Sequence, residues 1–292
     1  MSDMKRIDTR AFAEIARPLG ARGLKISQSG TLKAYETWAP EIRRNVYSVS
    51  KSFTSAAVGM ALEEGLLSLD EKLTDVFSDE LPDAPNAYLE AAELRDLLTM
   101  CLGQDQAYMM SEQRRFYKEK DWVKLALSFP LTHAPGTHFV YNNVGPYLAG
   151  VLLQRRAGTD LVSYLMPRLF APLGIEKPDW ERDPEGYTFG SSGLMLTLSE
   201  IHKFGLLYLN EGKWEGRQLV PASWVEACRT PQDDPGYSYL FWLGDESYRA
   251  DGKYAQFVII FPEKEAVISL VSQCDDNDKM LKAIRETLCP QL

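Results

Sequence analysis

Segments with the composition of β-strands occur at both ends of this chain, whereas its middle carries helical patterns. Near the N-terminus, two β-leaning runs in GLKISQSGTLKAYETW flank a turn-like triplet at residues 28–30, which predicts a hairpin. Toward the C-terminus, residues 238–244 and 256–272 are rich in Tyr, Phe, Val and Ile, with a turn at Pro262 inside the second run. We therefore expect antiparallel strands from the two chain ends to share one sheet.

Helical signals run through the middle of the chain and recur near its end. The pattern at Thr197 and Glu200 is a capping box, which marks the start of a helix. The whole pattern predicts an α/β (α+β) fold, in which residues 1–65 and 186–292 form an antiparallel sheet domain flanked by helices, and residues 66–185 form a helical domain. Small-molecule sites usually lie in the cleft between such lobes. Outside the helical domain, helices are predicted at residues 9–18, 49–67, 198–209 and 279–288.

Composition narrows the class of protein and of partner. With 292 residues, 45% of them hydrophobic and 25% charged, the chain has the composition of a folded globular protein and not of a disordered one. Its formal net charge is −9, from 32 basic and 41 acidic residues. This acidic balance weighs against nucleic acid and anionic membranes as partners.

Cysteine usage and the N-terminal region bear on location. The first twenty or so residues carry charges throughout, and no apolar run approaches the roughly 18 residues that cross a bilayer. Free thiols are the expected state of cysteine in a reducing cytoplasm. We therefore expect a cytoplasmic protein without a membrane segment, unless a leader was removed before residue 1. Four cysteines are scattered without the spacing of a zinc site or a CxxC motif: Cys101, Cys228, Cys274 and Cys289.

The sequence Ser48-Val49-Ser50-Lys51 stands where an extended segment meets a long predicted helix. A step of three residues on a helix places the Lys51 amine beside the Ser48 hydroxyl. A serine hydroxyl is a poor nucleophile until a base accepts its proton, and a lysine does so only where burial and nearby positive charge lower its pKa. The dipole at a helix N-terminus also favours the negative charge that develops there. This pattern indicates Ser48 as nucleophile and Lys51 as its base.

A serine and a lysine three residues apart also occur by chance, so solvated side chains in a first helical turn are the plain alternative. A second copy of the pattern, Ser2 to Lys5, lies in a charged N-terminal segment. Only the copy at Ser48 precedes a long apolar helix face, which favours it as the catalytic one.

A second candidate element is Tyr141-x-Asn143, which follows a Pro-Gly turn and precedes an apolar helical run. A tyrosine in such a loop can share a proton with a lysine, and Asn143 can hold both that lysine and a substrate carbonyl. The chain has another copy, Tyr208-x-Asn210, at the end of an amphipathic helix. There Tyr208 is better explained as a core residue and Asn210 as part of a C-cap, so the pattern alone is a weak signal.

These residues lie in segments that resemble the class C β-lactamases and related esterases, within the penicillin-recognising serine hydrolases. YSVSKSFTSAAVGMALEEGLLSLDEKLTDVF is similar to the family's nucleophile region, and PGTHFVYNN to its tyrosine loop. RLFAPLGIEKPDW and GSSGLMLTLSEIHKFGLLYLNEGKWEGRQLVPASWV are similar to the stretch that joins the helical lobe to the sheet. The resemblance covers roughly residues 24–285, in the order of the family. It implies a β-lactamase-like fold, acyl-enzyme chemistry, and no metal or organic cofactor.

The resemblance also implies a third motif, Lys-Thr-Gly or a His-x-Gly variant, on a strand that lines the cleft. The matching position is Ala250-Asp251-Gly252, followed by Lys253. Gly252 fits because a close approach of backbone to substrate requires a residue without a side chain, whereas Ala250 lacks the basic group. Following the family, Asp251, Gly252 and Lys253 would contact the substrate, and the backbone N–H groups of Ser48 and Lys253 would form the oxyanion hole.

Three activities share this machinery: hydrolysis of carboxylic esters, of β-lactams, and of D-amino-acid peptides or small amides. A cytoplasmic location disfavours a cell-wall peptidase, and the missing basic residue at Ala250 disfavours substrates anchored by a carboxylate. We therefore rank a small ester or amide first as substrate and a β-lactam second. A binding module that kept the fold but lost turnover is the alternative from another class. The intact Ser48, Lys51, Tyr141 and Asn143 argue against it.

Other polar and aromatic residues have simpler explanations. His133 and His138 lie in a Pro-Gly loop without a nearby set of acidic or cysteine ligands, so we expect no metal there. His202 falls on an amphipathic helical segment and is interpreted as a surface residue or as a neighbour of the helix cap. Four aromatic residues are expected to pack in the core or the sheet more than to line a pocket: Tyr237, Tyr239, Phe241 and Trp242.

Overall fold

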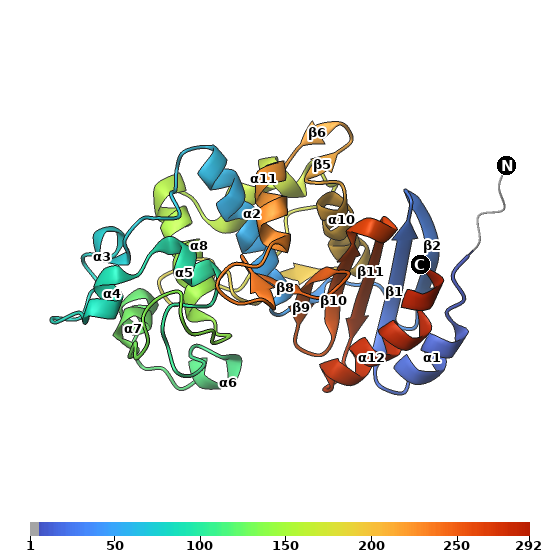
Figure 1. Cartoon of the computed structure of the whole chain (residues 1–292), viewed down its shortest axis with the longest axis horizontal. Coiled ribbons are helices and arrows are strands. Elements are labelled where there is room, and N and C mark those ends of the chain that lie inside the picture. The colour runs from blue at the N-terminus through green and yellow to red at the C-terminus, as the bar shows by residue number, and fades with distance from the viewer. Residues whose placement is uncertain (1–5) are drawn as a thin grey trace.

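The computed structural model describes residues 6–292, so the pattern from Ser2 to Lys5 lies outside the described residues. Figure 1 shows two parts side by side, a sheet with helices on its faces and a cluster of helices and loops. Both ends of the described chain, from residue 6 to residue 292, belong to the sheet part, and the chain between them builds most of the helical part. The mixed architecture with an antiparallel sheet confirms the predicted fold class.

One sheet of seven strands organises the sheet part, in the order β2-β1-β11-β10-β9-β8-β7. The first strand pairs antiparallel with the last, with Ile26 opposite Ile268, so the two chain ends share one sheet as predicted. The seven strands are β1 (Ala21–Gln28), β2 (Thr31–Thr37), β7 (Tyr237–Ser238), β8 (Phe241–Leu243), β9 (Tyr248–Gly252), β10 (Gln256–Phe261) and β11 (Ala266–Ser272). Two small sheets pair β3 (Arg44–Asn45) with β4 (Met195–Leu196), and β5 (Lys213–Trp214) with β6 (Arg217–Gln218).

Helices cover the sheet and build the second part. The predicted capping box is present, because the Thr197 side chain accepts from the Glu200 N–H at 3.1 Å and the Glu200 carboxylate accepts from the Thr197 N–H at 2.8 Å. The helices are α1 (Arg10–Ala16), α2 (Val49–Glu63), α3 (Leu73–Val76), α4 (Ala87–Ala91), α5 (Leu94–Leu98), α6 (Ser111–Arg114), α7 (Trp122–Ser128), α8 (Val144–Ala157), α9 (Leu161–Leu165), α10 (Leu198–Leu209), α11 (Ala222–Arg229) and α12 (Asn277–Thr287).

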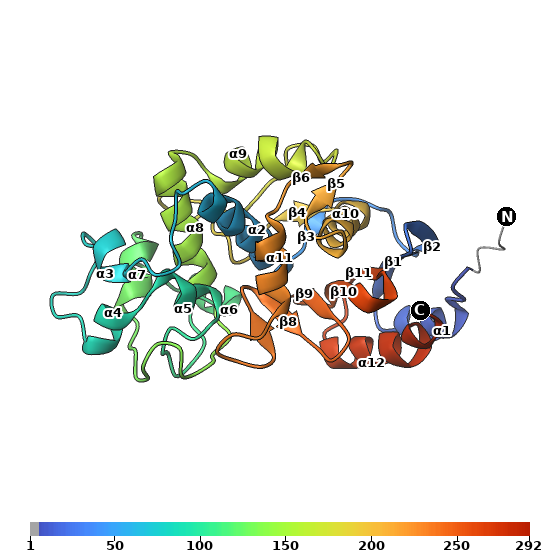
Figure 2. The ribbon, with the colours of Figure 1, turned by 45° about the horizontal axis from the view of Figure 1, so that its top comes forward.

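Two apolar cores lie on opposite faces of the sheet. Successive residues of a strand point to opposite faces. Phe257 and Ile259 of β10 therefore belong to the core with α1 and α12, while Val258 and Ile260 belong to the larger core with α2, α8 and α10. Figure 2 shows α10 on one side of β10 and β11, with α1 and α12 on the other. Because both faces are covered, these two strands are buried throughout and form continuous hydrophobic runs in the sequence.

Helix α2 lies where the two parts meet. Its residues from Val49 to Ala61 are all buried, the polar side chains among them included, as expected of a helix that is covered on all sides. It contacts α8 and α9 of the helical part and β9 and β10 of the sheet. A Cβ on Gly59 would lie 2.2 Å from the Trp224 ring, so only glycine permits this approach of α11. The N-terminus of α2 is thereby placed at the junction of the two parts.

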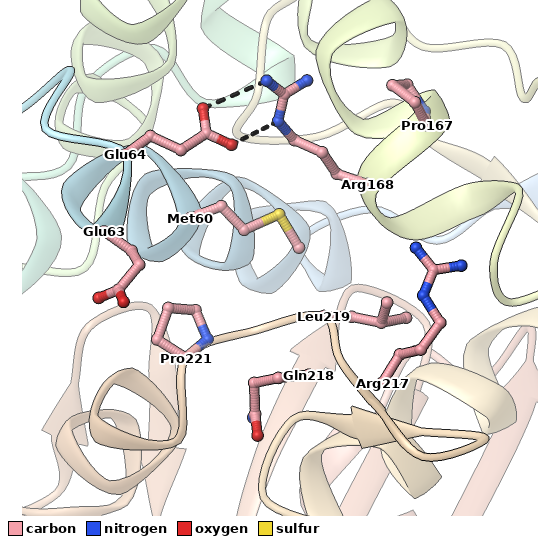
Figure 3. A pocket seen from close by; sticks show the side chains of 9 residues that line it. All are labelled: Met60, Glu63, Glu64, Pro167, Arg168, Arg217, Gln218, Leu219 and Pro221. Atoms are coloured by element: carbon pink, nitrogen blue, oxygen red, sulfur yellow. Dashed lines mark hydrogen bonds and ion pairs between the residues drawn. The ribbon is translucent and has the colours of Figure 1, made fainter.

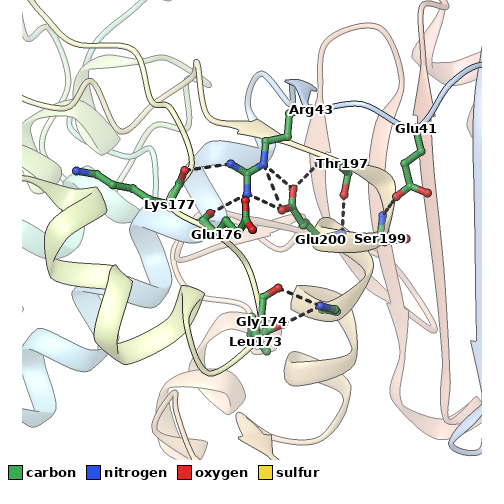
Figure 4. Close-up of polar contacts among 10 residues, drawn as sticks. Glu41, Arg43, Leu173, Gly174, Glu176, Lys177, Thr197, Ser199 and Glu200 are labelled. Atoms are coloured by element: carbon green, nitrogen blue, oxygen red, sulfur yellow. Dashed lines mark hydrogen bonds and ion pairs between the residues drawn. The ribbon is translucent and has the colours of Figure 1, made fainter.

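An ion pair anchors the segment that leads into α2. Arg43 donates to the Glu200 carboxylate at 2.7 Å, and also to the carbonyls of Glu176 and Lys177 at 2.7 and 3.0 Å (Figure 4). These contacts join the chain before β3 to the start of α10 and to the loop after α9. The Val46 N–H then donates to a carbonyl next to β4 at 2.9 Å, so the backbone just before residue 48 is held on both sides.

Two turns of the sheet part can be compared with the sequence prediction: the first agrees with it and the second differs from it. Between β1 and β2, Ser29 and Gly30 both have positive φ, of 47° and 70°, as a two-residue hairpin turn requires. Residues 238–244, expected as one strand, instead form β7 and β8 around a tight turn at Tyr239 and Leu240. The cause is tertiary, because hydroxyl groups of α2 donate to the carbonyls of these two turn residues at 2.7 and 2.9 Å.

His202 is buried, with 2% of its surface exposed, which corrects its interpretation as a surface residue. Its ring nitrogens lie 2.8 Å from the Ser27 hydroxyl of β1 and 2.9 Å from the Ser269 hydroxyl of β11. Burial lowers the pKa of the ring to about 3, with a smaller effect from Lys25, so the ring is neutral. The sheet-facing side of α10 carries a polar residue because the sheet supplies two hydroxyl partners.

Four further observations concern membrane crossing, metal ligands, two histidines and the cysteines. Within residues 6–292 no helix combines the length and apolar character needed to cross a membrane. In the same residues, no three His, Cys, Asp or Glu side chains gather as metal ligands would. The rings of His133 and His138 pack against each other, with centroids 4.1 Å apart. All four cysteines are free thiols, and three of them are buried.

Candidate active site

The predicted nucleophile stands at the start of α2. Tyr47, the residue before it, has a backbone φ of 49°. This value lies in the left-handed region, which residues other than glycine rarely adopt. The Tyr47 N–H donates to the Asn45 side chain at 2.7 Å, which helps to hold this strained turn. The turn redirects the chain from β3 into α2 and leaves Ser48 as the N-cap residue, partly exposed to solvent. Its hydroxyl therefore lies at the positive end of a long helix.

Lys51 lies one turn along α2 and is 1% exposed. Its Nζ atom lies 3.0 Å from Ser48 Oγ, 2.6 Å from Asn143 Oδ1 and 2.9 Å from the carbonyl oxygen of Ser191. Burial lowers the pKa of the amine well below its ordinary value, and the positive charge of Arg114 lowers it further. None of the three hydrogen-bonding partners is a carboxylate, so no negative charge in contact with the amine offsets the effect of burial.

Tyr141 and Asn143 come from the loop before α8. The Lys51 amine lies 4.9 Å from the centroid of the Tyr141 ring. Burial raises the pKa of the Tyr141 hydroxyl above its ordinary value, and a hydrogen bond with Ser48 opposes this only in part. The Asn143 amide nitrogen donates to the Met109 carbonyl at 2.9 Å. The fold thus brings together the predicted nucleophile, lysine, tyrosine and asparagine from two distant segments.

Strand β9 closes the site on the other side of the nucleophile. A Cβ on Gly252 would lie 2.4 Å from the Val46 carbonyl oxygen and 3.4 Å from the Ser48 backbone nitrogen, so no side chain fits there. Lys253 follows in the turn after β9 and lines the same cavity as Ser48. Within residues 6–292, the backbone N–H groups of Ser48 and Lys253 donate to no other group. Both are therefore available to an oxygen of a bound molecule.

The residues around Ala250 alternate between the core and the cavity, as strand geometry requires. Ala250 is 1% exposed and belongs to the larger core, whereas Arg249 and Asp251 line the cavity. Arg249 Nε donates to Asp251 at 3.1 Å, and the Asn277 side chain at the start of α12 donates to the same carboxylate at 3.0 Å. The cavity therefore holds an arginine, with the charge of that arginine offset by a neighbouring carboxylate.

These side chains line one open cavity of about 530 Å³, a volume suited to a small molecule. Lys51 is the predicted site residue that does not line it, because it lies behind Ser48. Charged groups of both signs stand around the cavity, so its electrostatic character is mixed. Its other walls include Met110, Glu112, Arg114, Trp242, Asp278 and Leu281.

Ser191 is a site residue that sequence reasoning missed. Its carbonyl accepts from Lys51, and its hydroxyl donates to the Asn143 carbonyl at 2.7 Å. Gly190 and Gly193 on either side have positive φ, of 70° and 87°, so the Gly-Ser-Ser-Gly run was the available signal.

Two more cavity residues were not assigned to the site from the sequence. Trp242 was assigned to the core or sheet, but it lines the cavity and stacks on Tyr141 at 5.2 Å between ring centroids. Arg114 carried no sequence signal, because nothing in its local pattern distinguishes it from the adjacent Arg115. The other three aromatic residues of that group are buried as expected: Tyr237, Tyr239 and Phe241.

A second cavity, of about 390 Å³, lies at the C-terminal end of α2 (Figure 3). Glu64 and Arg168 form an ion pair at 2.7 Å on its wall, and Met60 and Leu219 supply apolar surface. None of the residues predicted for catalysis lines it, and it contains no serine, cysteine or histidine. It offers no nucleophile, and the cavity beside Ser48 is the candidate active site.

Comparison with known families agrees with this geometry. The Beta-lactamase family model matches residues 23–288, which is most of the chain. The chain belongs to this family. The resemblance drawn from the nucleophile region and the tyrosine loop is thereby confirmed. Members of the β-lactamase family include hydrolases that differ widely in substrate, so membership supports a serine hydrolase more than any one reaction.

Two relatives show the range of the family around this chain. It is similar to the D-aminopeptidase of Brucella anthropi, with 28% identity over 248 residues, which are 77% of this chain and 43% of the relative. It is also similar to the 6-aminohexanoate-dimer hydrolase of Paenarthrobacter ureafaciens, with 22% identity over 273 residues, which are 82% and 69% of the two chains. The chain thus spans less than half of the D-aminopeptidase it matches.

Among solved structures, the fold is similar to that of a putative 6-aminohexanoate-dimer hydrolase from Bacillus anthracis. The TM-score is 0.82 at 19% sequence identity, and the match covers 95% of this chain and 80% of the other. At this identity the likeness shows the β-lactamase-like fold. It confirms the fold expected from the sequence.

Proposed function

We propose that this protein is a serine hydrolase that cleaves small carboxylic esters or amides through an acyl-enzyme. The observation that carries the proposal is the 3.0 Å contact between a buried Lys51 amine and the hydroxyl of Ser48, which faces a cavity. In this mechanism Ser48 Oγ attacks the carbonyl carbon of the substrate and its proton passes to Lys51. Tyr141 relays a proton to the leaving group, and the acyl group stays on Ser48.

The contacts of the Lys51 amine support its role as a base. A neutral amine has two hydrogens and one lone pair. In the neutral form that the mechanism requires, the oxygens of Asn143 and Ser191 accept these two hydrogens, and the lone pair would then face Ser48 Oγ at 3.0 Å. Burial lowers the pKa of Lys51 and raises that of Tyr141, so a neutral amine beside a protonated tyrosine is the favoured state. Tyr141 then serves as the proton donor in acylation and helps to activate water in deacylation.

The oxyanion of the tetrahedral intermediate needs hydrogen-bond donors that are already in place. We assign this role to the backbone N–H groups of Ser48 and Lys253, which have no other acceptor within residues 6–292. Gly252 supports the assignment, because its missing side chain lets β9 approach the Ser48 nitrogen. Asn143, Asp251 and Lys253 are assigned to substrate binding. No step of this mechanism needs a metal or an organic cofactor.

Two observations guide the substrate class. The relatives named for D-aminopeptidase and aminohexanoate-dimer hydrolysis favour small amides among the candidate substrates. In the cavity, Asp251 pairs with Arg249 at 3.1 Å, so the arginine charge is not free for a substrate carboxylate. We therefore keep neutral esters and amides ahead of β-lactams. The four free cysteines are compatible with the cytoplasm as the working compartment.

The proposal predicts that serine-directed probes acylate Ser48 alone. Labelling with a fluorescent fluorophosphonate, followed by intact-mass analysis, is expected to show one adduct that is absent from Ser48→Ala. Ser50 and Ser52 are matched controls, because both lie within the same turn of α2 but are 1% exposed or less. An adduct on either of them would contradict the assignment of the nucleophile. A wild-type protein that forms no adduct would indicate a binding module without turnover.

A second prediction concerns the substrate. We expect p-nitrophenyl acetate to be hydrolysed with a higher kcat/KM than a chromogenic cephalosporin, since the cephalosporin carboxylate meets Asp251 in the cavity. Asp251→Asn removes that charge and releases Arg249, so it is expected to improve the cephalosporin selectively, by about tenfold, or roughly 1.4 kcal/mol. A wild type that is already faster on the cephalosporin would make this protein a β-lactamase.

A further inference from the structure

Arg114, the last residue of α6, is held tightly on the wall of the cavity. Its side chain is 9% exposed. Its Nη1 donates to the Met109 carbonyl at 3.2 Å, and its Nη2 donates to the two carboxylate oxygens of Glu181 at 2.9 and 3.0 Å. The guanidinium carbon lies 4.2 Å from the centroid of the Phe189 ring. Only a planar, forked cation makes these contacts together, so lysine would not replace it.

The Met109 carbonyl connects Arg114 to the candidate catalytic lysine. The same oxygen accepts from Asn143 Nδ2 at 2.9 Å, and Asn143 Oδ1 lies 2.6 Å from Lys51 Nζ. Met109 has φ of 58°, a conformation that a non-glycine residue keeps only where its surroundings hold it. The Met109 N–H donates to the Tyr117 hydroxyl at 3.2 Å, so this peptide segment is held from both sides. Arg114 therefore supports the orientation of Asn143 through one shared oxygen.

Arg114 also acts on Lys51 through its charge. The charge disfavours a second cation at the amine and lowers the pKa of Lys51, an effect smaller than that of burial. Tyr141 is the other titratable group beside the amine, and Asp251 of β9 acts on Tyr141. Glu181 pairs with Arg114 and offsets part of the arginine charge. The strength of the effect on Lys51 therefore depends on both members of this pair.

We propose that Arg114 is a positioning residue of this site, which holds the Met109 carbonyl that orients Asn143 and, through Asn143, the Lys51 amine. The inference rests on the proposed function and deepens it, because it names what sustains the base. Arg114 acts through Asn143 and Lys51 and takes no part in bond making. Arg114 thus has two effects, the hydrogen bond to the Met109 carbonyl and the effect of its charge on Lys51. Mutation can separate these two routes, since the hydrogen bond needs the forked guanidinium and the electrostatic effect needs only a positive charge.

The test measures the second-order rate constant for acylation of Ser48 by a fluorophosphonate, from intact mass, across the pH range. Acylation falls at low pH as Lys51 becomes protonated. In Arg114→Met, which loses both shape and charge, we expect a rate at least about tenfold lower at neutral pH. We also expect the midpoint of the acid limb to move to higher pH, because the amine regains proton affinity when the neighbouring charge is removed.

Two further variants separate the routes. Arg114→Lys keeps the positive charge but loses the forked guanidinium. We therefore expect a lower rate of Ser48 acylation, with the acid limb of the pH profile near its wild-type position. Glu181→Gln leaves the Arg114 charge without its partner, so we expect the acid limb to move to lower pH, opposite in direction to Arg114→Met. Arg115→Met is the matched control: it removes the same charge from the next residue, which is exposed and does not line the cavity.

The possible outcomes distinguish this inference from the proposed function. An Arg114→Met protein whose rate and acid limb both match those of Arg115→Met would overturn the inference, while Ser48 labelling in the wild type would leave the proposed function standing. If circular dichroism shows that Arg114→Met does not fold, Glu181→Gln decides, and an absent or upward shift rejects the role of the charge. A wild type without any Ser48 adduct would reject the proposed function and this inference with it.

Discussion

The proton affinity of the Lys51 amine depends on the surroundings of this residue more than on its being a lysine. In water a lysine amine is protonated at neutral pH and cannot accept a proton from serine. Here the amine is 1% exposed, its partners are a hydroxyl and two carbonyl-type oxygens, and its pKa is lowered by burial and then by Arg114. The spacing of three residues between Ser48 and Lys51 was visible in the sequence. The burial that lowers the pKa of the Lys51 amine was not.

At this scale we predict that Lys51→Ala and Tyr141→Phe each reduce kcat/KM for p-nitrophenyl acetate by about 10²–10⁴, as expected of general acid–base groups. Because the proposed mechanism passes one proton through both residues, the double variant is expected to lose much less than the product of the two single losses. The measurement is a double-mutant cycle at fixed pH. Simple multiplication of the two losses would show that the two side chains do not act as a unit.

At the scale of elements, the site depends on how closely β9 approaches the start of α2. The approach is possible because Gly252 has no Cβ, and a Cβ there would lie 2.4 Å from the Val46 carbonyl oxygen. The glycine was noticed in the sequence through its resemblance to a family motif. That Ala250 belongs to the buried side of the strand, with Arg249 and Asp251 on the cavity side, followed only from the pairing of β9 with β10.

We predict that Gly252→Ala lowers the rate of Ser48 acylation by at least about tenfold, since β9 must move away from the nucleophile and a displacement of about 1 Å can cost 10²-fold. The measurement is the fluorophosphonate rate constant together with the thermal midpoint of unfolding. Gly150→Ala is the matched control, because a Cβ there meets ordinary contacts, the nearest at 3.4 Å, inside helix α8. Equal rates in the two variants would show that the close approach of β9 is not needed.

At the scale of the whole molecule, α2 is a shared element of both parts. Phe53 on this helix is fully buried, and its ring stacks on Phe204 of α10 at 4.0 Å and on Phe170 after α9 at 6.0 Å between centroids. One side chain thus contacts both the sheet part, through Phe204, and the helical part, through Phe170. The division into residues 1–65 with 186–292 and residues 66–185 stays a prediction, and α2 couples the two sides of it.

We predict that Phe53→Ala lowers the free energy of unfolding by about 3–5 kcal/mol, the usual loss for a large buried ring, and that unfolding remains one transition. The measurement is urea denaturation followed by tryptophan fluorescence and by circular dichroism. Phe116→Ala is the control, because Phe116 is 70% exposed and its loss is expected to change stability by about 0.5 kcal/mol or less. Two separated transitions in the Phe53 variant would contradict the shared core.

The sequence by itself determined the features that depend on neighbouring residues. The hairpin turn at Ser29 and Gly30, the capping box at Thr197, the hydrophobic runs of β10 and β11, and the Ser48 helix start all appear where local pattern placed them. Each of these follows from backbone conformation or from the period of a single element, which a few residues specify. Local patterns were therefore sufficient for the fold class and for placing the candidate nucleophile at a helix start.

Only the tertiary structure decided which distant residues meet. It placed His202 between two sheet hydroxyls and divided residues 238–244 into two strands. It also brought Ser191 to the candidate catalytic lysine, and Arg114 to the carbonyl that holds Asn143. These outcomes depend on burial and on partners contributed by other elements, and neither property is encoded in the spacing along the chain. A buried polar group is stable only beside its partner, so its role becomes defined when the elements that carry both have packed.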